Sequence, residues 1–340
     1  MTSHTKTLDR KRAWVSEFLS APMVDMVQLD SNFAGIYVPE AELGADRIGI
    51  TDQFLANAEA YATTYGNSAH FSSLFRQAFL ATAYQPDNDT KILDIGTGSG
   101  VNTIVPCLNL FPGCRIVATD LSPNLLRILR GYVTSQNLED RVACVCTDAM
   151  NNYFVPGSFD VVVGAAILHH ILDPLQTITA AYDALRSGGT TFFFEPFEGM
   201  ALVRVAFTLI LERSRREALA LDANVARFLE AMIVDIKART GTDKSDEKFR
   251  YMDDKWLFTR HYLENVGKRA HFATTAIIPH AFHESAIFEQ VISLLRVGMG
   301  KTPAALPDWA WDMIRTFDTA FSAEMKRDLL LEGTIVFRKA

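Results

Sequence analysis

The middle of the chain alternates short, wholly apolar runs with segments that carry the period of an amphipathic helix. Apolar runs lie at residues 91–95, 115–119, 142–146, 159–164 and 190–194, with helical stretches at 101–111, 124–136 and 175–185. Strands that are apolar throughout are typical of a sheet covered by helices on both faces. Because strand–helix–strand units connect by right-handed crossovers, this pattern predicts an α/β fold with a doubly wound parallel sheet.

The segments on either side of this centre are predominantly helical in pattern. We divide the chain into a helical N-terminal cover (1–88), the strand–helix core (89–199), a helical cap insertion (200–267) and a C-terminal part (268–340). The C-terminal part is expected to complete the sheet with strands at 272–278 and 334–337, separated by a second helical insertion. In the N-terminal cover, a helix over 52–84 is expected to break at the turn signal of residues 66–68.

Composition limits the classes of partner that the chain can have. The formal net charge is -7, which argues against a broad phosphate-binding face, so we expect no nucleic-acid partner. No stretch reaches the 18 or so uninterrupted apolar residues of a membrane span, and the first residues lack a signal-peptide core, so stable membrane insertion is not expected. The four cysteines lie in apolar surroundings without a second pair at zinc spacing, which indicates no metal and a reducing, cytoplasmic location.

A glycine-rich turn follows the first apolar run. Residues 92–100 read ILDIGTGSG, and such a turn brings backbone amide groups close to a ligand. The spacing G-x-G-x-G differs from the G-x-G-x-x-G of dinucleotide-binding proteins. Asp94 precedes the turn, where it would repel a pyrophosphate but suits a ligand that carries an ammonium group.

Two further acidic residues lie at the ends of the next two strands. Asp120 ends the second strand, at about the distance where an acidic residue accepts hydrogen bonds from ribose hydroxyls. Asp148 follows the third strand, where its carboxylate can accept from the exocyclic amine of adenine. Each of them alone reads as a helix cap or loop residue, but three acids at successive strand ends together indicate a nucleoside-binding edge.

At these motifs the chain resembles the class I S-adenosylmethionine-dependent methyltransferases. The resemblance rests on residues 93–100 (LDIGTGSG), 120–123 (DLSP), 148–149 (DA), 159–162 (FDVV), 168–174 (LHHILDP) and 185–189 (LRSGG). It implies a Rossmann-like sheet of seven strands with the last antiparallel, and S-adenosyl-L-methionine as co-substrate. The implied cofactor-binding residues are Asp94, Gly96, Thr97, Gly98, Gly100, Asp120, Leu121, Asp148, Ala149 and Ala165. Tyr65 is added as a contact to the carboxylate end of the donor, whereas Tyr61 is assigned to helix packing.

Three residues are candidates for catalysis. Methyl transfer from a sulfonium is an in-line displacement that needs alignment and exclusion of water, and an oxygen or carbon nucleophile benefits from a general base. His169 and His170 follow the fourth strand in a loop that faces the donor methyl in the family, and Glu195 ends the fifth strand. A packed loop histidine and a helix cap are the alternative interpretations.

The aromatic and aliphatic residues of 200–330 predict a closed, largely apolar pocket. We therefore expect a methyltransferase (EC 2.1.1.-) that modifies an oxygen or carbon of a small lipophilic or aromatic metabolite, as in secondary metabolism. Alternatives are the same fold using the bound sulfonium for cyclisation or rearrangement, a nicotinamide-dependent oxidoreductase, and an RNA methyltransferase. Whether the chain forms a homo-oligomer is left open.

Overall fold

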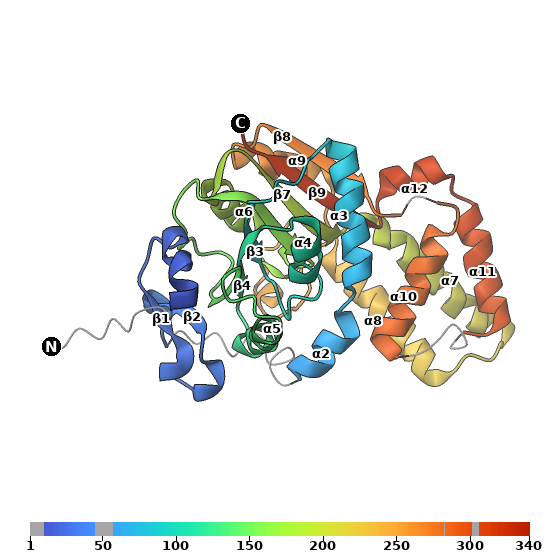
Figure 1. Cartoon of the computed structure of the whole chain (residues 1–340). Helices are drawn as coiled ribbons and strands as arrows, with labels where there is room; N and C mark the ends of the chain where they lie inside the picture. Colours follow the sequence, from blue (N-terminus) through green and yellow to red (C-terminus); the bar gives the residue numbers. More distant parts are fainter. Residues whose placement is uncertain (1–9, 45–56, 282, 301–305) are drawn as a thin grey trace.

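The computed structural model describes residues 10–44, 57–281, 283–300 and 306–340, and its strands form one mixed sheet of nine (Figure 1). The strands are β1 Met23–Asp25, β2 Ile36–Pro39, β3 Lys91–Ile95, β4 Arg115–Asp120, β5 Val142–Cys146, β6 Phe159–Ala165, β7 Leu185–Pro196, β8 Thr274–Pro279 and β9 Glu332–Arg338. Their order across the sheet is β1-β2-β5-β4-β3-β6-β7-β9-β8. All neighbouring pairs from β2 to β7 are parallel, and β9 runs antiparallel to both β7 and β8.

Helices cover both faces of this sheet, as the wholly apolar strands predict. On one face lie α3 Ser68–Thr82, α4 Ile104–Leu110 and α5 Pro123–Ser135, and on the other α6 Pro174–Ala184, α9 Arg260–Arg269 and the 3-10 helix η1 Arg10–Phe18. Neighbouring strand residues alternate between the two cores, so that Ile92 packs with Phe75 of α3 while Leu93 packs with Ile178 of α6.

Helix starts follow the predicted caps. α5 begins at Pro123, and the hydroxyl of Ser122 accepts a hydrogen bond from the Leu125 amide at 3.3 Å. The remaining differences in the core are small. α4 begins three residues later than expected, because residues 101–103 still belong to the turn. β7 takes in residues 185–189, expected as a helix end, because its pairing with β6 is irregular there and Gly188 adopts a φ of +75°.

The N-terminal segment differs most from the expectation. Residues 1–88 were expected as a helical cover and the sheet as seven-stranded, yet β1 and β2 extend the sheet beside β5. The four residues of β2 are all buried, but a run this short carries no readable period. Short 3-10 helices surround it: η2 Met26–Gln28, η3 Ser31–Phe33 and η4 Glu40–Glu42.

The expected helix of residues 52–84 appears as two helices, α2 Ala58–Tyr65 and α3, which are separated at Gly66 as predicted. Its first residues, 52–56, lie outside the described residues.

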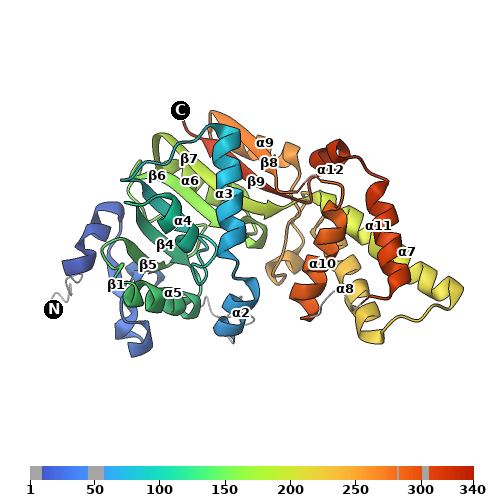
Figure 2. The same cartoon turned by 45° about the vertical axis from the view of Figure 1, so that its right-hand side comes forward.

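The two late insertions pack together into one helical body. It consists of α7 Ala201–Glu217, α8 Ala223–Arg239, α10 Ala286–Met299, α11 Asp308–Thr319 and α12 Ala323–Leu329. Its buried residues form a third core of their own, apart from the two cores of the sheet. Figure 2 shows this body beside the sheet, on the side of α3 and β9. The division of the chain into domains stays a proposal, but α9 lies on the sheet rather than in the helical body.

None of the described helices combines the length and the apolar character that crossing a membrane requires.

Candidate active site

A cavity of about 500 Å³ lies where β3, β4, β5 and β6 end. The sheet reverses its winding beside β3, since chain order runs outward through β4 and β5 on one side and through β6 and β7 on the other. Ligands of doubly wound sheets bind at this switch point, beyond the carboxyl ends of the strands. Among the predicted donor-binding residues, those on the cavity wall are Gly96, Gly98, Asp120, Leu121, Asp148, Ala149 and Ala165.

The glycine turn brings bare backbone to the cavity. Gly96, Gly98 and Gly100 all have a positive φ, at +69°, +55° and +78°, which other residues adopt at a cost. A Cβ at Gly96 would lie 2.4 Å from the Ile167 side chain, so glycine is needed there for packing. A Cβ at Gly98 would meet no atom within 4 Å, because this position opens onto the cavity.

Asp120 is oriented by the turn that it faces. One carboxylate oxygen accepts a hydrogen bond from the Gly98 amide and the other from the Ser122 amide, both at 2.8 Å. Burial raises the pKa of Asp120, although these backbone hydrogen bonds favour the charged form. The carboxylate therefore stands fixed on the cavity wall, with lone pairs left to accept further donors.

Asp94 lies behind the glycine turn rather than on the wall. It is fully buried, and the Thr103 hydroxyl donates to its Oδ2. Its Oδ1 has no hydrogen-bond partner in the described part of the chain, and neither has the buried Oγ1 of Thr97. Burial raises the pKa of Asp94 to about 7, against the opposing hydrogen bond from Thr103. A buried carboxylate oxygen without a donor is unfavourable, which favours the protonated form of this group.

Gly100 and the two tyrosines of α2 have roles that the sequence does not settle. A Cβ on Gly100 would lie 2.5 Å from Leu129, so this glycine allows α5 to approach the turn. Tyr61 lies on the cavity wall, whereas Tyr65 is 49% exposed and stacks on Tyr61 with ring centroids 4.7 Å apart. The two tyrosines are four residues apart and share a helix face, so only the placement of α2 decides which one faces the cavity.

Glu195 organises the loop that follows β6. Its Oε1 accepts hydrogen bonds from the amides of Ile167 and Leu168 at 3.0 and 2.7 Å. Its Oε2 accepts from the His169 amide at 3.3 Å and lies 2.7 Å from Nδ1 of the His169 ring. Neither Glu195 nor His169 lies on the described cavity wall, so both support the loop from behind.

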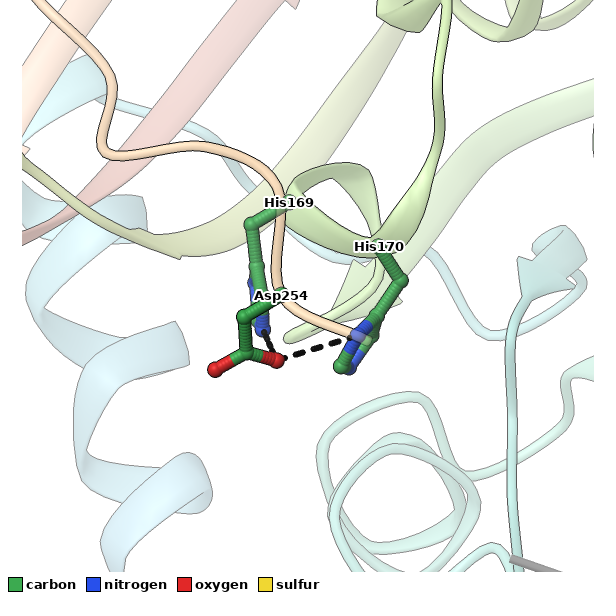
Figure 3. Close-up of side chains that lie close together, drawn as sticks. All are labelled: His169, His170 and Asp254. Atoms are coloured by element: carbon green, nitrogen blue, oxygen red, sulfur yellow. Dashed lines mark ion pairs between the residues drawn. The ribbon is translucent and has the colours of Figure 1, made fainter. Parts of the chain in front are cut away.

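His169, His170 and Asp254 converge beside the cavity (Figure 3). Asp254 Oδ1 lies 3.4 Å from Nε2 of His169 and 3.2 Å from Nδ1 of His170. The other oxygen of Asp254 pairs with Arg239 at 3.0 Å. His170 Nδ1 also lies 3.0 Å from the Asp253 carbonyl oxygen, and the His170 ring contributes to the cavity wall. These are the described residues whose ligand atoms lie close enough together to hold a metal ion.

The two histidines differ in charge because their surroundings differ. Burial lowers the pKa of His169, but the carboxylates of Glu195 and Asp254 outweigh burial and raise it to about 9. Burial and the neighbouring charge of His169 lower the pKa of His170 to about 3. Burial likewise disfavours the charged Asp254, yet His169 and Arg239 hold its pKa well below the usual range. His170 is therefore the neutral imidazole at the cavity.

Residues 250–255 form a wall of the cavity that the sequence motifs do not reveal. Arg250 ends the 3-10 helix η8 Glu247–Arg250, and Met252, Asp253 and Lys255 follow it on the wall. The segment is tied to the histidine loop, because the Lys255 amide donates to the His169 carbonyl at 2.7 Å. Nothing in the local pattern marks these residues, since they lie some 83 positions from the loop that they contact.

Comparisons with known proteins identify relatives of part of this chain. The family model of the methyltransferase domain matches residues 93–193. A ubiquinone biosynthesis O-methyltransferase of Xanthomonas campestris pv. campestris is 34% identical over 104 residues, which is 30% of this chain and 41% of that protein. Ajmaline N-methyltransferase of Rauvolfia serpentina is 26% identical over 134 residues, 38% of this chain and 45% of that protein. The chain thus spans under half the length of these relatives.

Solved structures show the same fold. Phosphoethanolamine N-methyltransferase 2 of Haemonchus contortus, in complex with S-adenosyl-L-methionine, superposes with a TM-score of 0.51. That likeness covers 86% of this chain and 59% of the nematode chain at 19% identity. The family model thus places a methyltransferase domain in the Rossmann-like core of this chain.

Proposed function

We propose that the protein transfers a methyl group from S-adenosyl-L-methionine to an oxygen or carbon of a small lipophilic or aromatic metabolite. One observation carries this proposal. A single cavity brings together the glycine turn, the strand-end carboxylates Asp120 and Asp148, and the neutral imidazole of His170. The donor-binding edge and a polar group able to meet an acceptor thus share one space of about 500 Å³.

The donor fits the wall that the first three strands provide. Asp120 would accept from the ribose hydroxyls, and Asp148 and Ala149 would contact adenine. The turn from Gly96 to Gly98 would lie against the methionine part, and the buried Asp94 would support this turn from behind. The Haemonchus contortus enzyme of the same fold was crystallised with S-adenosyl-L-methionine, which supports this choice of donor.

The reaction needs alignment and one proton acceptor. The acceptor oxygen bonds to the methyl carbon as the carbon–sulfur bond breaks, and the neutral thioether leaves. The acceptor's hydroxyl group donates a hydrogen bond to the neutral His170 imidazole on the wall, and its proton passes on to water, because a ring with a pKa of about 3 does not hold a proton at neutral pH. Glu195 and His169 position this ring by fixing the loop.

The acceptor is argued from the rest of the wall. Apolar side chains dominate it: Met150, Ile167, Ile171, Leu172 and Met252. Arg250 and Lys255 add two positive charges, which suit a phenolic, enolic or acidic oxygen on an otherwise apolar molecule. Cyclisation on the same fold and hydride transfer with a nicotinamide gain no specific support from these residues.

Binding of the donor is tested with Asp120→Ala, measured by calorimetry with S-adenosyl-L-methionine and S-adenosylhomocysteine. Losing two charge-assisted hydrogen bonds to ribose should weaken the affinity by about 10- to 1000-fold, or roughly 1.5–4 kcal/mol. Asp140→Asn, an exposed carboxyl group, is the control and should bind as the parent does. Equal affinity in Asp120→Ala and the parent would contradict the ribose role.

Transfer itself is tested by incubating the protein with methyl-labelled donor and a panel of phenolic, enolic and acidic lipophilic compounds. Label in the product supports methyl transfer, whereas conversion without label supports the cyclisation alternative. His170→Ala should lower kcat at saturating donor by roughly 100-fold or more while leaving donor affinity near that of the parent. An unchanged kcat in this variant would remove His170 from the reaction.

A further inference from the structure

We propose that His169, His170 and Asp254 bind one divalent transition-metal ion of the Zn²⁺ type at the wall of the cavity. The three donor atoms are Nε2 of His169, Nδ1 of His170 and Oδ1 of Asp254, which converge on one point (Figure 3). Two imidazoles and one carboxylate form a ligand set that zinc and its neighbours in the first transition series accept.

The spacing of the donor atoms fits an ion between them. Zinc ligands at about 2.0–2.1 Å from the metal in tetrahedral geometry lie roughly 3.3 Å from one another. Asp254 Oδ1 lies 3.4 Å from His169 Nε2 and 3.2 Å from His170 Nδ1. The two histidine nitrogens lie within 4.8 Å of each other, so an ion can bind after adjustment of the side chains alone. These side chains come from the loop after β6 and from the segment after η8.

The surroundings hold each ligand in the required state. Metal-binding histidines commonly donate their other ring N–H to a carboxylate. Glu195 takes this place 2.7 Å from His169 Nδ1, and it is itself fixed by three backbone amides. With Nδ1 donating to Glu195, Nε2 of a neutral His169 directs its lone pair at Asp254. Arg239 holds the second oxygen of Asp254 at 3.0 Å, so the first oxygen stays directed at the histidines.

The negative charges around the cluster also favour a cation between its three donor atoms. The contact of 3.4 Å between His169 Nε2 and Asp254 Oδ1 requires a positive charge between the two atoms, which either a proton on His169 or a metal ion supplies. The carboxylates of Glu195 and Asp254 contact the His169 ring, and Arg239, which Asp254 shares with Asp235, offsets only part of their negative charge. A divalent ion balances this excess, and the rival occupant is a single proton on His169.

The ion would have open positions toward the cavity, because His170 and Asp253 both contribute to its wall. The Asp253 carbonyl oxygen, 3.0 Å from His170 Nδ1, is placed to add a fourth ligand. Such an ion lowers the pKa of an acceptor oxygen that it binds, so that the proton leaves to water while His170 serves as a ligand. The inference goes beyond methyl transfer, since ion binding is measured without donor or acceptor.

The test uses the full chain after treatment with a chelator and dialysis. Co²⁺ is titrated while visible absorption is recorded, and Zn²⁺ is then titrated by calorimetry. We expect one equivalent of each ion and d–d bands of a four- or five-coordinate site. His170→Ala and Asp254→Asn should each weaken binding at least 10-fold, and Glu195→Gln should weaken it 10- to 100-fold through the His169 ring.

His261→Ala and Asp312→Asn are the matched controls, since His261 lies on the exposed face of α9 and Asp312 pairs with Arg315 on the surface of α11. Both should bind as the parent does, and circular dichroism checks that every variant is folded. Should Asp254→Asn unfold, His170→Ala decides alone. Absence of saturable one-to-one binding, or equal affinity in the parent and His170→Ala, would overturn the proposal and leave a proton as the occupant. Donor binding through Asp120 is unaffected by either result.

Discussion

The carboxyl group of Asp94 titrates near neutral pH, because burial raises its pKa. Its pKa is raised to about 7 because no water reaches it, and one of its oxygens has no partner within the described residues. The folded protein therefore binds this proton more tightly than the unfolded chain, where an aspartate titrates near pH 3.9. The stabilisation that this bound proton gives to the folded state is complete below about pH 4 and is lost as the pH rises through 7.

The direction of this pKa shift predicts how the stability of the fold changes with pH. Over the interval from about pH 4 to pH 7 the Asp94 carboxyl should cost the fold up to about 4 kcal/mol, taking 1.36 kcal/mol for each pKa unit. Asp94→Asn removes the titration, so the variant should match the parent at pH 4 and exceed it in stability at pH 8. Urea unfolding at pH 4, 6 and 8 measures this difference. An identical pH dependence in parent and variant would show that Asp94 titrates normally.

Glu195 gives a second prediction at the residue scale. Its carboxylate accepts hydrogen bonds from three amides, and an amide side chain in its place would turn a donor toward other donors. Glu195→Gln should therefore destabilise the fold by roughly 1–3 kcal/mol and lower kcat, while donor affinity changes little. Chemical denaturation and calorimetry with S-adenosylhomocysteine separate the two effects. Loss of donor affinity without loss of stability would contradict a positioning role.

At the scale of elements, a buried ion pair links two helices of the helical body, α11 and α12. Lys326 of α12 lies 2.6 Å from Asp318 of α11, and both side chains are almost completely buried. Asp318 also accepts a hydrogen bond at 2.9 Å from the Phe288 amide, in the first turn of α10. Three helices thus meet at one carboxylate, which caps α10 and needs the lysine to balance its charge.

Lys326→Met tests this junction. Removing the lysine leaves a buried charge uncompensated, and such losses typically cost about 3–5 kcal/mol. Arg216→Met is the control, because Arg216 pairs with Glu217 at the surface, where ion pairs contribute about 0–1 kcal/mol. Urea unfolding of both variants gives the comparison. Equal stabilities of the two variants would show that α12 is not held by the pair.

Element positions were predictable where the pattern is local and long enough. β3 and β5 match their predicted bounds, and α5 and α6 lie within a residue of theirs, because strand runs buried on both faces and capped helices leave clear signals. β1 and β2 escaped prediction because three or four residues show no period, and their pairing depends on the exposed edge of β5. The sheet has nine strands rather than seven for this reason.

At the scale of the whole molecule, the cavity draws most of its wall from the α/β core and one wall from the cap insertion. The helical body packs around its own core and supplies no helix to the described wall. Donor binding should therefore protect the cavity segments without tightening that body. It also stabilises the fold by mass action, by about 2.7 kcal/mol at a donor concentration 100 times Kd.

Hydrogen exchange with and without S-adenosyl-L-methionine measures this division. Slower exchange is expected in the glycine turn, after β4 and β5, in the histidine loop and in residues 250–255. Exchange in α10 and α11 should change little, and these helices serve as the internal control. Protection concentrated in α10 and α11 would place the donor elsewhere.

The sequence by itself determined the proposed donor edge, because the glycine turn and the acids at the ends of β3, β4 and β5 act through their own short stretch of backbone. Only the tertiary structure decided what faces that edge. In the folded chain Tyr61 rather than Tyr65 lies on the cavity wall, and Glu195 and His169 lie behind that wall. Asp254 contacts two histidines that are more than 80 residues away in the sequence. Such pairings depend on how the cap insertion packs on the sheet, and side-chain packing between distant segments leaves no local trace in a single sequence.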